Sequence, residues 1–124
     1  MSTNEKFSRT PEPPYYAVIF TSQRSSDASG YDQMAVALDE LAAQQTGYLG
    51  QSSARDADGF GITVSDWRDE DCVKHWKNVA LHKTAQRQGR ERWYSEYDVR
   101  VSKVERAYAG ANASAEAVAG TALD

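Results

Sequence analysis

The chain has little of several residue types whose presence would indicate a particular environment. Its 124 residues include one cysteine, Cys72, so no internal disulfide can form and folding does not require an oxidising compartment. No run of about eighteen apolar residues occurs, so the sequence predicts no spanning helix. The N-terminal stretch MSTNEKFSRTPEPPYY lacks the apolar core of a signal peptide. Together these absences favour the cytoplasm and predict no membrane contact.

A surplus of basic residues is also missing. Lys and Arg number 14 against 18 Asp and Glu, a formal net charge of −4, whereas phosphate binding normally shows as a basic excess. We therefore expect no nucleic-acid partner. The two histidines, His75 and His82, are not spaced as a helical i, i+4 metal pair, and no cysteine pair exists, so the sequence predicts no metal site.

Bulky apolar residues are scarce at both ends of the chain. All three prolines lie before Tyr15, in a stretch with almost nothing to bury, and the stretch AGANASAEAVAGTALD at the other end holds little more than small residues. Such segments cannot bury enough apolar surface to become ordered. The sequence predicts a disordered segment over residues 1–14, one folded domain over 15–108 and a mobile low-complexity tail over 109–124.

Between these ends, hydrophobic periodicity predicts six elements. The stretch YYAVIFTSQR is apolar on both parities, which is typical of a central strand. Apolar residues recur at helical spacing from Tyr31 to Thr46, and Gly47 is expected to stop that helix. The predicted elements are a strand at 15–24, a helix at 31–46 and two strands around the turn 56–59, the second of them at 60–67. A second helix is predicted from the acidic triplet 69–71 to about residue 81, with a continuation toward 89. The last element is a strand within 92–108.

The order of these elements defines the predicted fold class, α+β. Two strand-helix-strand units with right-handed crossovers place both helices on one face of an antiparallel sheet, the ferredoxin-like βαββαβ arrangement. The alternation of the last strand slips near Ser102 and Lys103, which predicts a bulge or a change of partner there. Because this strand is long and the second sheet face has no helix to cover it, we expect a homodimer through the sheet face and the C-terminal strand.

Residues in three of these elements resemble a known family. The strand GITVSDW, the helix DEDCVKHWKNVALHKTAQRQGRERWY and the last strand YDVRVSKVERAY are similar to the antibiotic biosynthesis monooxygenase (ABM) domain family, within the dimeric α+β barrel superfamily. The likeness extends over most of 15–108. The chain also resembles a subgroup of small stand-alone bacterial members, in which a common set of residues recurs. These residues are Trp67, Trp76, His82, Gly89, Tyr94, Val104, Arg106 and Tyr108.

The resemblance implies an activity as well as a fold. Members of the family include enzymes that oxygenate electron-rich aromatic compounds, such as anthrones and quinols, without a metal or flavin. Such chemistry requires of the protein a base, a donor beside the developing oxyanion and an apolar space that excludes water. The resemblance therefore implies a monooxygenase-like protein with no cofactor and with a small aromatic ligand, although one fold can hold many sites.

Other members of the family degrade haem. Their site uses an asparagine on the first strand, a tryptophan on the second helix and an iron-ligating histidine further along that helix. Trp76 matches the tryptophan, whereas Gln23 stands near the asparagine position and Gln86 near the ligand position. His82 stands four residues before that ligand position, about one helical turn away along the axis. Haem binding through His82 is therefore only a third hypothesis.

Three polar residues are candidates for the site. His82 is the candidate base, because an imidazole ordinarily titrates near neutrality, and Arg24 at the end of the first strand is the candidate catalytic cation. Gln23, or Arg24 itself, would anchor the substrate. Each has a structural alternative, because a histidine off the apolar stripe and an arginine at a strand end also fit a solvated surface.

Three aromatic residues, Trp67, Trp76 and Tyr31, are candidates for the walls of a substrate pocket. Trp67 and Trp76 also have the spacing of core residues, and Cys72 at the start of the second helix is expected to pack. The competing hypothesis for the whole chain is a non-catalytic protein of the same fold that binds a small ligand or acts under stress.

Overall fold

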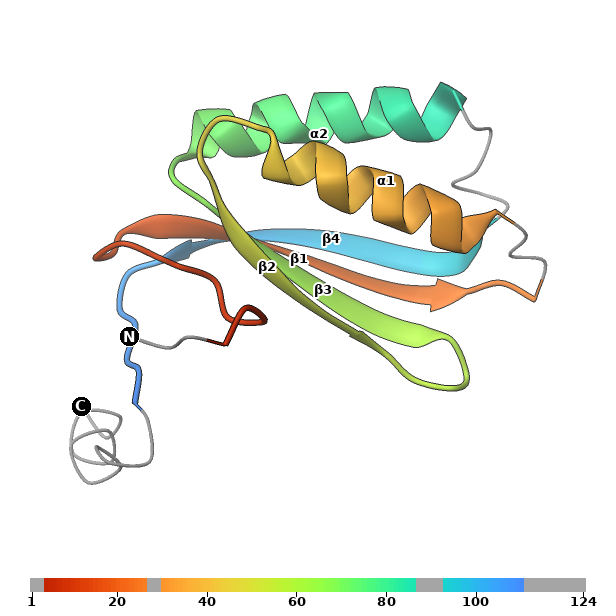
Figure 1. The fold of residues 1–124 in the computed structure, drawn as a ribbon, viewed down its shortest axis with the longest axis horizontal. Helices are drawn as coiled ribbons and strands as arrows, with labels where there is room; N and C mark the ends of the chain where they lie inside the picture. Colours follow the sequence, from red (N-terminus) through yellow and green to blue (C-terminus); the bar gives the residue numbers. More distant parts are fainter. Residues whose placement is uncertain (1–3, 27–29, 87–92, 111–124) are drawn as a thin grey trace.

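In a computed structural model of the chain, residues 4–26, 30–86 and 93–110 are described, without the side chains of residues 84–86. They form one sheet in the order β2-β3-β1-β4, with both helices on one face (Figure 1). This is a ferredoxin-like α+β fold, so the predicted fold class is confirmed. The elements are β1 (Tyr15–Arg24), α1 (Tyr31–Ala43), β2 (Tyr48–Arg55), β3 (Phe60–Trp67), α2 (Glu70–Gln86) and β4 (Tyr94–Val104).

The first strand is central, as its double-sided apolar pattern predicts. β1 pairs antiparallel with β3 on one side and with β4 on the other. Because side chains alternate along a strand, Tyr16 and every second residue after it point toward the helices, on what we call the helix face. The alternate residues, from Tyr15 onward, lie on the opposite side, the open face.

The core lies between the helix face and the two helices. Trp67 is fully buried there, together with Ala42 from α1 and Val73 from α2. The predicted apolar stripes of both helices face this core, and Met34 and Ala42 are almost inaccessible. The partly buried residues packed around the core are Tyr16, Val18, Tyr48 and Trp76.

Helix α1 ends earlier than predicted. It stops at Ala43 rather than Thr46, because the backbone N–H groups of Gln44 and Gln45 bond three residues back, to Leu41 at 3.2 Å and to Ala42 at 3.0 Å. Such bonds tighten the last turn and end the α-helical ladder. Gly47, at φ +84°, then turns the chain into β2.

The prediction of a bulge or a change of partner near Ser102 and Lys103 in the last strand is wrong. Pairing runs without a shift where Ser102 and Lys103 meet β1, and the register shifts instead at the other end, where Tyr94 pairs with Arg24. Val104 lies opposite the buried Tyr15 on the open face, so an apolar residue is accommodated there without a bulge. The part of the second predicted helix that reaches Gly89 lies outside the described residues, and α2 extends to Gln86.

The N-terminal segment, residues 4–14, follows β2 and the open face (Figure 1). The Arg9 N–H donates to the Leu49 carbonyl at 3.1 Å, and the Ser52 hydroxyl donates to the Lys6 carbonyl at 2.5 Å. These contacts are not visible in the composition, which predicts disorder for this segment. Of the predicted mobile tail, residues 111–124 lie outside the described residues.

Candidate functional site

A row of three residues crosses the helix face of the sheet. Gly61 on β3 pairs with Ser22 on β1 and with Arg55 on β2. A Cβ atom at Gly61 would lie 2.7 Å from the Cζ atom of Arg55, so only glycine lets the guanidinium lie across β3. Arg55 therefore reaches the buried Ser22, donating from Nη2 to the hydroxyl at 2.7 Å and from Nη1 to the carbonyl at 3.3 Å.

Two guanidinium groups lie over one tyrosine ring. The Cζ atom of Arg24 is 5.5 Å from the ring centroid of Tyr31, and that of Arg55 is 5.3 Å from it. Both distances are within the range of cation–π attraction. Within the described part of the chain, neither guanidinium has a carboxylate close enough for an ion pair. We call Arg24, Arg55 and Tyr31 the guanidinium cluster.

Aromatic residues extend the guanidinium cluster along the sheet. The ring of Tyr31 meets that of Tyr94 edge-on at 5.7 Å, and Phe20 meets Tyr94 at 5.3 Å and Tyr97 at 5.8 Å. Burial, followed by a hydrogen bond with Tyr31, raises the pKa of Tyr94 far above its ordinary value. Its hydroxyl therefore stays protonated at neutral pH and can donate a hydrogen bond.

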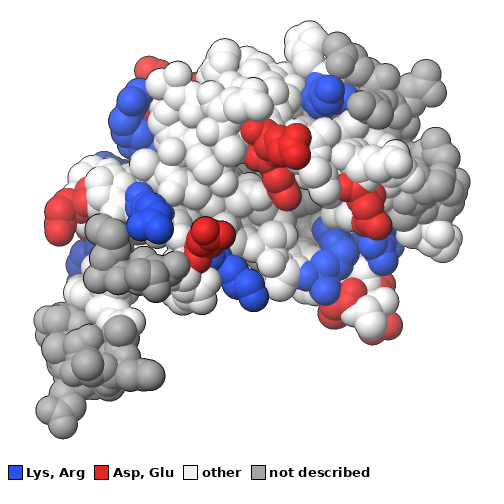
Figure 2. Space-filling model, viewed as in Figure 1, with Lys and Arg blue, Asp and Glu red and all other residues white. Residues whose placement is uncertain are grey.

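A cavity of about 590 Å³ opens beside the cluster. It lies where the end of β1, the start of α1 and the β2–β3 turn meet. Its wall carries one cation, Arg24, and two carboxylates, Asp32 and Asp58. Basic and acidic side chains also lie close together near that turn in Figure 2, at the lower right. The full lining is Arg24, Ser25, Ser26, Asp32, Ala57, Asp58 and Gly59.

The β2–β3 turn that forms one wall is held by local bonds. The Asp56 carboxylate accepts the N–H groups of Asp58 at 2.9 Å and Phe60 at 3.0 Å. Gln23 Nε2 donates to the Asp58 carbonyl at 2.7 Å. Gln23 therefore supports the turn, although sequence analysis assigned it as a substrate anchor, and it is not among the residues that line the cavity.

The two candidate tryptophans lie together, but in the core. The rings of Trp67 and Trp76 stack at 5.7 Å with an interplanar angle of 20°, and Tyr48 meets Trp67 edge-on at 5.5 Å. Trp67 Nε1 donates to the Ser65 hydroxyl at 2.9 Å. With an exposure of 0%, Trp67 offers no surface to a ligand in this conformation. Its role as a pocket wall stays a prediction.

The candidate base lies apart from the cavity. His82 is exposed on α2, and its Nδ1 atom is 3.3 Å from the carbonyl of Asn78 one turn earlier. It is not among the residues that line the cavity. Base catalysis by His82 and haem ligation by His82 both stay predictions, and a hemin titration of the parent and of His82→Ala would test the second.

The structure brings part of the predicted set of residues together. Arg24 and Tyr31 are brought together as candidates, but Arg55 and Ser22 were missed. An arginine paired with a glycine across a hairpin is a usable signal, but only when the register is known, since a one-residue slip moves the side chain to the other face.

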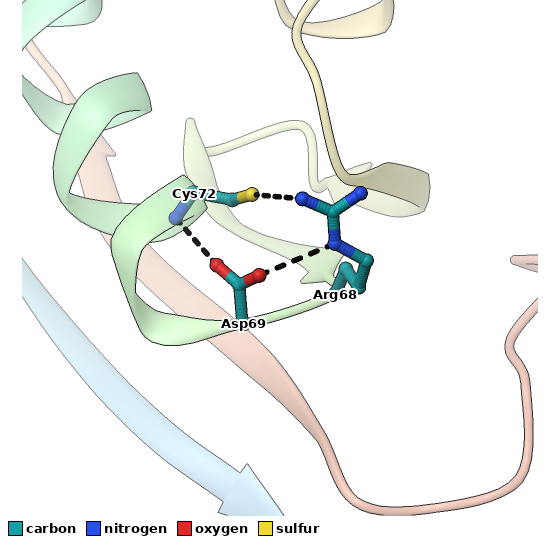
Figure 3. Close-up of polar contacts among 3 residues, drawn as sticks. All are labelled: Arg68, Asp69 and Cys72. Atoms are coloured by element: carbon teal, nitrogen blue, oxygen red, sulfur yellow. Dashed lines mark hydrogen bonds and ion pairs between the residues drawn. The ribbon is translucent and has the colours of Figure 1, made fainter.

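The start of α2 holds a second polar group of three residues (Figure 3). Asp69 caps the helix by accepting the Cys72 N–H at 2.9 Å, and the Arg68 guanidinium donates to Asp69 at 3.2 Å and to the Cys72 sulfur at 3.5 Å. Burial, followed by the carboxylate of Asp69, raises the pKa of the Cys72 thiol. The thiol stays protonated at neutral pH, so this group serves packing and capping rather than nucleophilic chemistry.

Two general features of the described residues bear on partners. No helix in this part of the chain is both long and apolar enough to cross a bilayer. Nor do these residues include a group of three or more His, Cys, Asp or Glu arranged to hold a metal ion.

Comparison with solved structures identifies the class of fold. SnoaB of Streptomyces nogalater, a cofactor-independent oxygenase, superimposes with a TM-score of 0.60 over 77% of this chain and 97% of its own, at 13% identity. A proposed antibiotic biosynthesis monooxygenase of Nitrosomonas europaea gives 0.59 over 77% of this chain and 93% of its own, at 11% identity. The chain thus has the ABM-like ferredoxin fold.

The particular family follows from sequence. The chain is 52% identical over 99 residues to the uncharacterized protein YqjZ of Bacillus subtilis (strain 168), covering 80% of this chain and 87% of YqjZ. It belongs to the YqjZ family within the ABM-like fold. No family model matches the sequence.

Proposed function

We propose that this chain is a cofactor-independent, monooxygenase-like protein that acts on an electron-rich aromatic or quinol-type small molecule. The observation that carries the proposal is the guanidinium cluster, Arg24 and Arg55 over Tyr31, beside a cavity large enough for a small aromatic compound. The fold shared with SnoaB supports the same class of chemistry.

The cluster supplies what an oxygenation without a cofactor needs from a protein. A phenol or enol that loses a proton becomes an electron-rich anion, which can pass an electron to oxygen. The Arg24 guanidinium lines the cavity and can stabilise that anion, and the charge of Arg55 lies behind the wall residue Gly59. Asp32 and Asp58 line the cavity and can accept the proton, which makes them better placed as bases than His82, which does not line it.

Oxygen uptake tests the proposal. A panel of anthrones, quinols and flavonols should include a compound whose oxygen consumption rises above the rate in protein-free buffer. Arg24→Gln should lower kcat by about 100-fold, as expected for the loss of a donor to the developing anion. His82→Ala should leave the rate within about twofold of the parent if the aspartates supply the base. A tenfold loss in His82→Ala would restore His82 as the base.

A second candidate function is small-ligand binding without turnover. The stacked rings of Trp67 and Trp76 favour it, because they fill the space beneath α2 that a reaction chamber between these indoles would need. Equilibrium dialysis with the same panel separates the two functions. Saturable binding with no oxygen uptake for any compound would replace the oxygenase proposal with this one.

We also propose a homodimer that forms through the open face. Phe60 and Ile62 on β3 are 46% and 43% exposed there, which is a high exposure for side chains of this size. Sedimentation analysis of the full chain should give twice the mass of one chain, and Ile62→Asp should shift it toward the monomer. A parent chain that sediments as a monomer at tens of micromolar concentration contradicts this assembly.

A further inference from the structure

Arg55 is a half-buried cation whose hydrogen-bond partners are all neutral among the described residues. It donates to the hydroxyl and carbonyl of Ser22 and to the carbonyl of Gly59. These acceptors orient the guanidinium but do not cancel its charge. Removing a cation from water without an opposite charge is costly, so such a group attracts an anion.

Arg24 places a second positive charge on the same aromatic ring. Both Cζ atoms lie within 5.5 Å of the Tyr31 centroid, and like charges this close to one ring repel one another. The ring offsets part of that repulsion through its π face. A bound anion would offset the rest, because it is attracted to both guanidiniums.

The two cations differ in how they meet the cavity. Arg24 lines it, whereas Arg55 lies behind Gly59, a wall residue whose carbonyl accepts its hydrogen bond. A ligand in the cavity would therefore contact Arg24 directly. Arg55 would act on the ligand through its charge, from its position over the Tyr31 ring.

We propose that the ligand of this cavity is a hydroxylated aromatic carboxylate, with its carboxylate bound by Arg24 and attracted by the charge of Arg55, and with its hydroxyl toward Asp32 and Asp58. The inference rests on the proposed function in taking the ligand to be an electron-rich aromatic compound. A carboxylate is planar and matches the fork of an arginine, and unlike a phenol it is anionic at neutral pH without a base.

The other charged groups of the cavity define the rest of the ligand. Asp32 and Asp58 also line it, and they would repel a second anionic group. They favour instead a hydrogen-bond donor, such as a phenolic hydroxyl, at the end of the ligand opposite its carboxylate.

Calorimetric titration of the full chain at pH 7 with two matched compounds tests this specificity. One is 6-hydroxy-2-naphthoate, and the other is 2,6-dihydroxynaphthalene, in which a neutral hydroxyl replaces the carboxylate. The parent should bind the naphthoate at least about tenfold more tightly, since a charge-assisted bond is stronger than a neutral one. Equal affinity for the two compounds overturns the proposal.

Variants assign the preference to the two arginines. Arg24→Gln should lower naphthoate affinity by about tenfold and Arg55→Gln by about threefold, with the dihydroxy compound changed less than about twofold in both. Arg68→Gln is the matched control, because Arg68 precedes α2, does not line the cavity and has a side chain that is 58% exposed. A loss in Arg68→Gln equal to that in Arg24→Gln, or a preference that survives in both cluster variants, overturns the proposal.

Two further measurements keep the test decisive. Arg55→Lys retains the charge and should retain most of the preference even if Arg55→Gln unfolds, which a thermal scan of each variant detects. Oxygen uptake separates this inference from the proposed function. If the naphthoate binds more tightly but no compound gives oxygen uptake, only the proposed oxygenase function is contradicted. If oxygen uptake occurs but the naphthoate is not preferred, only this inference is contradicted.

Discussion

The indole of Trp76 lies stacked on that of Trp67, with ring centroids 5.7 Å apart. Trp67 is fully buried beneath it and donates its Nε1–H to Ser65, so this pair forms the centre of the core. We expect Trp67→Phe to lower the free energy of unfolding by about 2 to 3 kcal/mol, because it leaves a void and removes a donor from a buried hydroxyl. Urea unfolding measures the loss.

The matched variant is Trp76→Phe. Trp76 is only partly buried, and its replacement leaves the bond from Trp67 to the Ser65 hydroxyl in place. The free energy of unfolding should therefore fall by only about 1 kcal/mol. Equal losses in the two variants would show that Trp67 is no more central to the core than its neighbour.

Two glycines with the same backbone conformation differ in the space around them, so their alanine variants distinguish backbone strain from a steric clash. Gly47 and Gly30 have φ values of +84° and +83°, but a Cβ at Gly47 would lie 2.4 Å from the sulfur of Cys72, whereas a Cβ at Gly30 would meet nothing within 4 Å. Gly30→Ala should cost about 1 kcal/mol for backbone strain alone. Gly47→Ala should cost at least about 2 kcal/mol, since the buried thiol must also move.

Thermal or urea unfolding of the two glycine variants measures the difference. If Gly47→Ala is no less stable than Gly30→Ala, the close approach of Gly47 to Cys72 at the start of α2 does not affect stability.

Gly61→Ala should affect the guanidinium cluster rather than stability. The added Cβ would lie 2.7 Å from the Cζ atom of Arg55, and a guanidinium at the end of a flexible chain can move away. We expect a stability change below about 1 kcal/mol, because the backbone of Gly61 is ordinary extended strand. The carboxylate preference should fall as in Arg55→Gln. An unchanged preference would show that the position of Arg55 across β3 does not matter for binding.

The sequence predicts the elements well because their signals are local. The bounds of β1 and β3 and the turn between Asp56 and Gly59 follow from apolar runs and turn residues, and the structure confirms them. The end of α1 does not follow in the same way. Gly47 marks the reversal, but the chain leaves the α-helix at Ala43 through tightened bonds at Gln44 and Gln45 that no residue type requires.

The site is less predictable because it depends on register and burial. Arg24 could be nominated from its place at a strand end, and Tyr31 from its aromatic ring. Arg55 could not, since only its pairing with Gly61 places it on the helix face and across β3. His82 has the right chemistry for a base, but its exposed position on α2 depends on how the helix is rotated against the sheet.

Tyr94 should make the protein less stable in alkali. Because burial raises the pKa of Tyr94 in the folded chain, the ionised form is favoured in the unfolded chain, which loses its proton near the ordinary value of 10.0. The stabilisation is therefore complete below about pH 9 and decreases as pH rises past 10, by up to about 1.4 kcal/mol per pH unit for one group. Urea unfolding from pH 8 to 11 measures this slope.

Replacing Tyr94 isolates its share of that slope. Burial also raises the pKa of Tyr48 and of Cys72, so Tyr94→Phe should make the decline shallower without abolishing it. Tyr108→Phe, at an exposed position beyond β4, is the control and should leave the slope as in the parent. If Tyr94→Phe declines as steeply as the parent, the Tyr94 hydroxyl is not buried against Tyr31 in the folded chain.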